Sequence, residues 1–129
     1  MPASTPYFAV VPRHTLPTLS CVIPCYNEAA NLRLLLPLLA EQLAQCSRQW
    51  EVILVNDGSR DDTSEVLSEW SKQPGFRAIE FSRNFGKEAA LTAGLDAAVG
   101  ETVVLMDADM QHPPQLIADM VQHWQNGAD

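Results

Sequence analysis

The apolar run within Glu51–Asn56 (EVILVN) constrains the fold of this 129-residue chain more than any other feature. Apolar residues follow one another here without the apolar–polar alternation of a half-buried strand, so the predicted strand is covered on both faces. Leu19–Ile23 (LSCVI) has the same character, and further strands are predicted at Arg77–Phe81 and Thr102–Met106. Strands covered on both faces are typical of a parallel sheet with helices above and below it.

The segments between the strands have the features of helices. Residues 27–46 place leucines close to a helical period, and Pro37 inside this segment predicts a kink or a late helix start. Residues 85–100 are rich in alanine and end at a glycine. Residues 112–127 have prolines near the start and a glycine at the end, which is the usual asymmetry of a helix.

A further helix is predicted after Asp62, which Glu65 follows three residues later as in a capping box. Strands that alternate with helices predict an α/β fold with a doubly wound, mainly parallel sheet and helices on both faces. In such sheets ligands bind beyond the carboxyl ends of the strands. The polar residues that follow each strand therefore form one candidate site.

The composition excludes several classes of protein. The chain has 16 acidic and 8 basic residues and a net charge of −8, whereas binding of nucleic acid needs lysines and arginines that neutralise phosphates. No apolar segment reaches the ~18 residues of a membrane helix, and residues 1–18 lack the pattern of a signal peptide. We expect a loose leader over residues 1–18 and one domain over residues 19–129.

The three cysteines are Cys21, Cys25 and Cys46, and their spacing does not match a zinc ligand set. Buried free thiols in a reducing compartment are favoured over a disulfide, because cytosolic proteins seldom keep disulfides. The sequence therefore predicts a cytoplasmic location.

Polar residues follow every predicted strand. The four segments are Pro24–Glu28 (PCYNE), Asn56–Asp62 (NDGSRDD), Ser82–Lys87 (SRNFGK) and Asp107–Pro114 (DADMQHPP). Any one of them is as consistent with a solvated loop as with a binding site. Four of them at one edge of a parallel sheet favour a shared site.

Asp107 and Asp109 end an apolar run, where two neighbouring carboxylates repel each other. In an extended backbone, residues two apart point the same way, and clustered carboxylate oxygens suit Mg²⁺ or Mn²⁺. Gln111 continues this alternation with an amide oxygen, and His112 either adds a ligand or, as we favour, caps the next helix. Helix capping and solvation are the alternative for the two aspartates. A bound cation would also let an acidic chain hold a diphosphate.

The motifs VIPCYNEAANL, VILVNDGSRDDT and FSRNFGKEAALTAGLDAAVGETVVLMDADMQHPP occur in this order and resemble the N-terminal half of family 2 glycosyltransferases with the GT-A fold. The resemblance runs from Leu19 to Asp129 and is strongest to polyprenyl- and dolichyl-phosphate sugar transferases of the cell envelope. It implies a Rossmann-like nucleotide-binding half, a UDP- or GDP-sugar donor, Mg²⁺ or Mn²⁺, and inverting transfer to a polyprenyl phosphate.

The resemblance also implies roles for matching residues. Those that contact the base and ribose would be Pro24, Tyr26, Glu28 and Asp57, with Asp57 hydrogen-bonded to the base. Those near the diphosphate would be Arg83 and Lys87, although for Arg83 a solvated position is equally consistent. The metal ligands would be Asp107, Asp109 and Gln111, with Asp107 on the metal, the ribose or both, and Asp109 the catalytic member. Asp57 and Gly58 could also simply form a tight turn.

The resemblance implies a hexosyltransferase that meets a lipid phosphate at the cytoplasmic face of a membrane. The chain looks shorter than the catalytic domain of this family, so we expect it alone to bind nucleotide without transferring sugar. Its open sheet edge would favour self-association. The alternative is a nucleotide- and metal-binding module without catalysis of its own. A nucleotidyltransferase is disfavoured, because PCYNE stands where that class has a loop rich in glycine and basic residues.

Overall fold

The computed structural model describes residues 19–45, 49–109, 119 and 122 of the chain. Strands and helices alternate in the order β1 (Leu19–Cys25), α1 (Ala29–Leu43), β2 (Trp50–Asn56), α2 (Thr63–Trp70), β3 (Phe76–Glu80), α3 (Lys87–Ala97) and β4 (Thr102–Leu105). All four predicted strands and the first three predicted helices are therefore present. The leader and Cys46 lie outside the described residues, and so does the helix predicted over residues 112–127 except for Asp119 and Gln122, which are helical. No helix in the described ranges has the length and apolar character needed to cross a bilayer.

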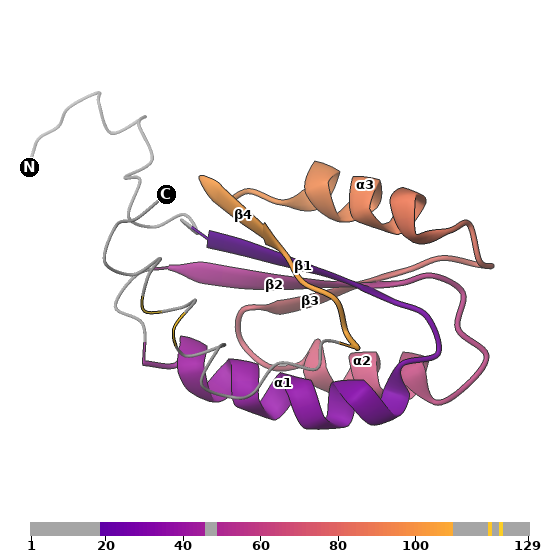
Figure 1. The fold of residues 1–129 in the computed structure, drawn as a ribbon, viewed down its shortest axis with the longest axis horizontal. Helices are drawn as coiled ribbons and strands as arrows, with labels where there is room; N and C mark the ends of the chain where they lie inside the picture. The colour runs from indigo at the N-terminus through magenta and orange to yellow at the C-terminus, as the bar shows by residue number, and fades with distance from the viewer. Residues whose placement is uncertain (1–18, 46–48, 110–118, 120–121, 123–129) are drawn as a thin grey trace, which may run out of the picture.

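The four strands form a single parallel sheet in the order β3-β2-β1-β4. Figure 1 shows α3 on one face of this sheet and α1 and α2 on the other. The predicted parallel sheet with helices on both faces is confirmed. Because all four strands run in the same direction, their carboxyl ends lie at one edge of the sheet.

The central strands send alternate side chains into two apolar layers. Ile23 of β1 and Leu54 of β2 are buried with the leucines of α1 and with α2. Val22 and Ile53 are buried on the opposite face, where Ala90 of α3 covers them. Both faces of β1 and β2 are thus apolar, which explains why their sequences read as continuous apolar runs.

Pro37 lies inside α1, and the helix begins at Ala29, well before it. The predicted late start is therefore wrong. A proline within a helix costs about 3 kcal/mol, since it removes a backbone hydrogen bond and crowds the preceding turn. The apolar face of the helix offsets this cost, because Leu36 and Leu39 are fully buried on either side of Pro37 and each contributes about 1.5–3 kcal/mol.

Candidate functional site

A pocket of about 380 Å³ lies at the carboxyl ends of the strands, where the segments that follow β1, β2, β3 and β4 meet. Seven predicted site residues line it: Pro24, Tyr26, Glu28, Asp57, Lys87, Asp107 and Asp109. Arg83 does not line this pocket, and Gln111 and His112 lie outside the described residues. The structure therefore brings together side chains from all four strand ends.

Asp57 follows β2 directly, and only 2% of its surface is exposed. Its Oδ1 accepts a hydrogen bond from the Phe85 N–H at 2.7 Å. Its Oδ2 accepts hydrogen bonds from the Gly86 N–H at 3.0 Å and the Asn84 amide at 3.2 Å. The carboxylate thus fixes the loop after β3 to the end of β2. Gly58, with φ +68°, has no room for a Cβ because the same loop lies against it.

Asn27 joins the loop after β1 to the loop after β2. Its side-chain Oδ1 accepts a hydrogen bond from the Arg60 N–H at 2.8 Å, and its own N–H donates to the Ser59 Oγ at 2.9 Å. Its φ of 53° lies in the left-handed region, which asparagine adopts more readily than most residues. Tyr26 and Glu28, which both line the pocket, flank this anchored residue.

Asp61 caps the start of α2, and the capping box predicted from Asp62 and Glu65 is wrong. The side chain of Asp62 makes no capping hydrogen bond. Asp61 Oδ1 instead accepts the Thr63 N–H at 2.9 Å, while Oδ2 accepts the Ala29 N–H at 3.3 Å. Partial burial alone would raise the pKa of Asp61, but a hydrogen bond from the Thr63 hydroxyl and the two from the N–H groups outweigh it and lower the pKa. One carboxylate therefore serves the starts of both α1 and α2.

Lys87, the first residue of α3, faces Asp107, which follows β4. The Lys87 Nζ lies 2.6 Å from the Asp107 Oδ1. This hydrogen bond and the attraction between the charges raise the pKa of Lys87, and the charge of Asp109 adds to the effect. Asp107 therefore has a basic partner, although no lysine or arginine lies close to it in the sequence.

Asp107 and Asp109 reach the pocket wall by a different backbone path from the extended one predicted. Strand β4 ends at Leu105, and the chain turns at Ala108 and Asp109. Ala108 is only 3% exposed and belongs to the larger apolar core, while the two aspartates on either side of it are exposed. The buried alanine anchors the turn and leaves both carboxylates at the pocket.

Glu28 adds a third negative charge to the pocket. Burial raises the pKa of Glu28, a hydrogen bond from the Asn31 amide at 3.3 Å opposes this shift, and the charges of Asp109 and Asp107 raise the pKa further. Burial is the largest cause of this shift, and the excess of negative charge from the nearby carboxylates adds to it. A bound divalent cation would relieve that excess.

Arg83, for which the family resemblance implies a place near a diphosphate, stacks on an aromatic ring. Its guanidinium carbon lies 4.7 Å from the centroid of the Phe85 ring. Phe85 in turn meets Phe81 edge-on, with 5.6 Å between the ring centroids. A contact of this kind holds the cation over the ring face, and a role for Arg83 in binding stays a prediction.

The pocket residues fit a hard divalent cation in their chemistry. Mg²⁺ is usually held by one or two carboxylates, and waters and substrate phosphates complete its shell. Asp107 and Asp109 supply two such carboxylates at one strand end. Within residues 19–45 and 49–109, no three acidic, histidine or cysteine side chains are placed to hold a metal on their own. A cation here would need further oxygen ligands, as a bound diphosphate provides.

Sequence reasoning missed Asn84, Gly86 and Ala108, which also line the pocket. Asn84 lies in the polar segment SRNFGK, but its hydrogen bond to Asp57 joins residues 27 positions apart. No periodic pattern records a contact at that separation. One signal was available in the sequence. Asp57 directly follows an apolar strand and is therefore expected to be buried, and a buried carboxylate needs hydrogen-bond donors from elsewhere in the chain.

A parallel α/β sheet with a polar pocket across its strand ends is the Rossmann-like arrangement, in which ligands bind at that edge of the sheet. The chain belongs to the family "Glycosyl transferase family 2", whose model matches residues 20–129. The family predicted from the motifs is therefore confirmed.

Similar proteins agree with this assignment. The chain is 43% identical over 109 residues to an uncharacterized glycosyltransferase, YkcC, of Bacillus subtilis, covering 84% of this chain and 34% of YkcC. It is 39% identical to an undecaprenyl-phosphate 4-deoxy-4-formamido-L-arabinose transferase of Pectobacterium carotovorum, covering 85% and 34%. The chain thus spans about a third of the length of these curated relatives.

A solved structure shares the fold. It is the glucosyl-3-phosphoglycerate synthase of Mycobacterium tuberculosis in complex with Mn²⁺, UDP and glucosyl-3-phosphoglycerate. The TM-score is 0.63 at 25% identity, with 86% of this chain and 40% of that chain covered. The GT-A architecture predicted from the motifs is confirmed.

Proposed function

We propose that the pocket binds the nucleoside diphosphate part of a UDP- or GDP-sugar together with Mg²⁺ or Mn²⁺. The observation that carries this proposal is the convergence of Asp107, Asp109 and Lys87 on one pocket at the carboxyl ends of the strands. A diphosphate needs positive charge around it, and a chain of net charge −8 offers little of its own. A divalent cation between the aspartates and the diphosphate would supply that charge.

Asp107 and Asp109 would hold the cation, and Gln111 remains a proposed ligand. A cation held there would supply Lewis-acid stabilisation of the negative charge that develops on a departing diphosphate. Lys87 would contribute a second positive charge at the same place, since its ammonium already lies beside Asp107. Arg83 would have to leave its position over Phe85 to join it.

The nucleoside would lie against Pro24, Tyr26 and Glu28, which line the same pocket on the side of β1. Tyr26 is 44% exposed and therefore presents a free ring surface. Asp57 would hydrogen-bond the base through Oδ1, which accepts one hydrogen bond from the protein and keeps capacity for another. Its other oxygen is already engaged by two donors.

The acceptor would be a polyprenyl phosphate, as the name of the Pectobacterium relative states for that protein. A phosphate is anionic at neutral pH, so its attack on the sugar needs no strong general base. Direct attack would invert the configuration at the sugar carbon. The reaction would take place at the cytoplasmic face of the membrane that carries the lipid.

The chain covers only about a third of its relatives, and we propose that on its own it binds the donor without transferring the sugar. In-line positioning of an acceptor can be worth ~7–11 kcal/mol. The alternative function is a truncated nucleotide- and metal-binding module with no catalysis of its own.

The test is transfer of labelled sugar from UDP-glucose or GDP-mannose to a short polyprenyl phosphate in the presence of Mn²⁺. The chain alone and the chain extended to the length of its relatives are compared, with nucleotide binding followed in parallel. Binding by both and transfer only by the extended protein supports the proposal. Binding without transfer by either supports the module, and absence of nucleotide binding from both excludes the proposal.

A further inference from the structure

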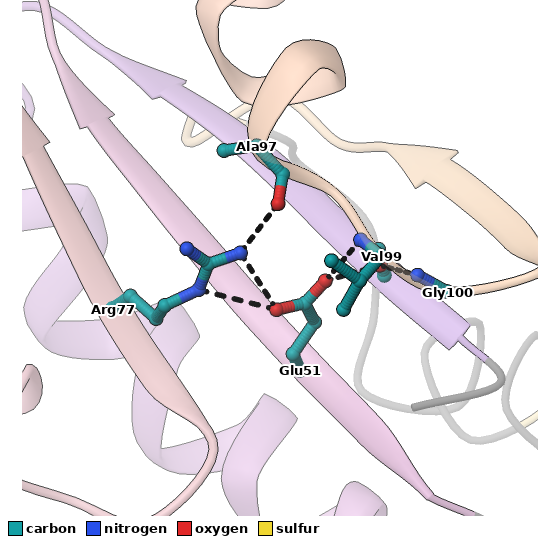
Figure 2. Close-up of polar contacts among 6 residues, drawn as sticks. Glu51, Arg77, Ala97, Val99 and Gly100 are labelled. Atoms are coloured by element: carbon teal, nitrogen blue, oxygen red, sulfur yellow. Dashed lines mark hydrogen bonds and ion pairs between the residues drawn. The ribbon is translucent and has the colours of Figure 1, made fainter. Parts of the chain in front are cut away.

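Glu51 lies near the start of β2, at the edge of the sheet opposite the pocket, and is only 6% exposed. Figure 2 shows its carboxylate at the centre of a polar network. Oε2 accepts hydrogen bonds from the Ser20 hydroxyl at 2.5 Å and the Val99 N–H at 2.9 Å. Oε1 accepts two from the Arg77 guanidinium, at 2.9 Å and 3.2 Å. A buried charge requires such partners, yet a buried ion pair often adds little net stability.

The network ties the connection between α3 and β4 to the three other strands. Arg77 also donates a hydrogen bond to the Ala97 carbonyl, the last residue of α3, at 2.6 Å. The Gly100 N–H donates to the Ser20 Oγ at 2.8 Å. Ala97, Val99 and Gly100 are thus held by groups from β1, β2 and β3, as Figure 2 shows for the labelled residues.

Gly100 approaches β1 so closely that no side chain fits there. A Cβ at this position would lie 2.7 Å from both the backbone nitrogen and the Oγ of Ser20. Its φ is not in the left-handed region, so the requirement for glycine comes from the close approach alone. The connection is therefore fixed by steric fit as well as by hydrogen bonds.

Strand β4 follows the anchored connection directly, and the buried residues after the strand hold its other end. It is four residues long, and among the described strands it pairs only with β1. Its register places Thr102 opposite Leu19, and the Met106 N–H donates to the Val22 carbonyl at 3.0 Å. A shift of one residue would turn every side chain to the other face, and a shift of two would move Asp107 by about 6.6 Å.

We propose that Glu51 is a positioning residue for the metal site. Through the anchored connection it sets the register of β4 on β1, and this register places Asp107 and Asp109 in the pocket. The effect on nucleotide binding rests on the proposed function, whereas the effect on β4 does not.

Amide hydrogen exchange in Glu51→Gln tests the effect on β4. The amide group has the size of the carboxylate but keeps only one acceptor oxygen, so the donors on one side of the anchor lose their partner. We expect the amides of β4 and of Met106 to exchange roughly ten- to a hundredfold faster relative to those of β2, which is the scale of hydrogen bonds to a charged group. The matched control is Val66→Ala in α2, which removes buried apolar atoms without touching the anchor.

Arg77→Lys is the second variant, because it keeps the positive charge but loses the planar donors that join Glu51 to Ala97. If Glu51→Gln does not fold, Arg77→Lys decides the question alone. The proposal would be overturned if the amides of β4 kept their protection relative to those of β2 in the folded variants. It would also be overturned if Glu51→Gln, Arg77→Lys and Val66→Ala all lost protection uniformly along the chain.

The second readout is Mn²⁺-dependent binding of UDP or GDP beside binding of the nucleoside alone. Glu51→Gln should weaken the metal-dependent binding about tenfold and leave the nucleoside affinity unchanged. If wild type binds no nucleotide, the proposed function fails, while the exchange data still decide the positioning role. Faster exchange of β4 with unchanged metal-dependent binding would overturn the link between Glu51 and the metal site.

Discussion

The ammonium of Lys87 and the carboxylate of Asp107 meet at 2.6 Å, although they follow different strands of the sheet. Lys87 begins α3, where the helix dipole disfavours a positive charge, and Asp107 sits beside a second aspartate at the end of β4. Each residue thus occupies a position that is unfavourable for its own charge, and the pair relieves both. A bound cation could replace Lys87 as the partner of Asp107, and a bound diphosphate could replace Asp107 as the partner of Lys87.

Lys87→Met should therefore change two affinities in opposite directions. Binding of Mn²⁺ alone should become several-fold tighter, because no ammonium has to be displaced from Asp107. Binding of UDP or GDP with Mn²⁺ should become weaker, because a positive charge beside the diphosphate is lost. Isothermal titration measures both, with the exposed Lys72→Met in the α2–β3 connection as the control. Weaker binding of Mn²⁺ alone would contradict this account of the pair.

Asp57→Asn should loosen the loop after β3. The new amide brings its own donor hydrogens to the N–H groups of Phe85 and Gly86, so at least one of them loses its acceptor. Leaving such a group unpaired costs about 1–3 kcal/mol, which urea denaturation should report as a lower free energy of unfolding. Asp96→Asn, on the exposed surface of α3, serves as the control. An unfolding free energy equal to that of wild type would refute the anchoring role.

Glu51 should make the stability of the protein sensitive to acid. Burial alone would raise the pKa of Glu51, but the hydrogen bonds from Ser20, Val99 and Arg77 outweigh it and hold the pKa below its usual value of 4.5. A carboxyl whose pKa is lowered on folding stabilises the fold above its unfolded pKa, and this contribution is lost as the pH falls through the folded value.

The difference in unfolding free energy between wild type and Glu51→Gln should thus be constant near neutral pH and shrink below about pH 4.5. Urea titrations at a series of pH values measure it. A difference that grows as the pH falls would have the wrong sign for a stabilised carboxylate. Glu65→Gln, on the exposed face of α2, controls for general loss of acidic charge.

The two described cysteines should be inert in the native protein. Cys21 and Cys25 are free and buried, as predicted, and burial raises the pKa of Cys21 to about 12 and that of Cys25 further still. Near pH 8 these two side chains are therefore almost entirely in the unreactive thiol form. In a Cys46→Ser background, a thiol reagent should react only after urea is added. Rapid reaction without denaturant would show that these thiols are accessible.

The fold could be predicted from local runs of apolar residues, because such runs reflect burial directly. The apolar runs of β1 and β2 are consequences of helices on both faces, so the parallel sheet could be inferred from them. The strand-end rule then placed Asp57, Asp107 and Asp109 in one site. The late helix start expected at Pro37 was wrong because buried leucines outweigh the local cost of a proline in α1.

Contacts between distant segments could not be predicted from the sequence, and the reason is physical. The bonds from Asp57 to residues 84–86, from Lys87 to Asp107 and from Glu51 to Val99 each join separate loops or strands. Their partners are chosen by the three-dimensional meeting of elements and not by periodicity. The capping of α2 by Asp61 is a local contact to Thr63, but the second role of the same carboxylate, at the start of α1, joins distant segments.

The central claim is that the aspartates after β4 support metal-dependent binding of a nucleoside diphosphate. Titration of UDP and GDP into wild type, Asp109→Asn and the control Asp96→Asn, each with Mn²⁺ and with a chelator, tests it most directly. The account predicts that wild type and Asp96→Asn bind only with Mn²⁺, and that Asp109→Asn binds about tenfold more weakly or not at all. Equal metal-dependent affinity in wild type and Asp109→Asn, or equal binding with the chelator, would contradict it.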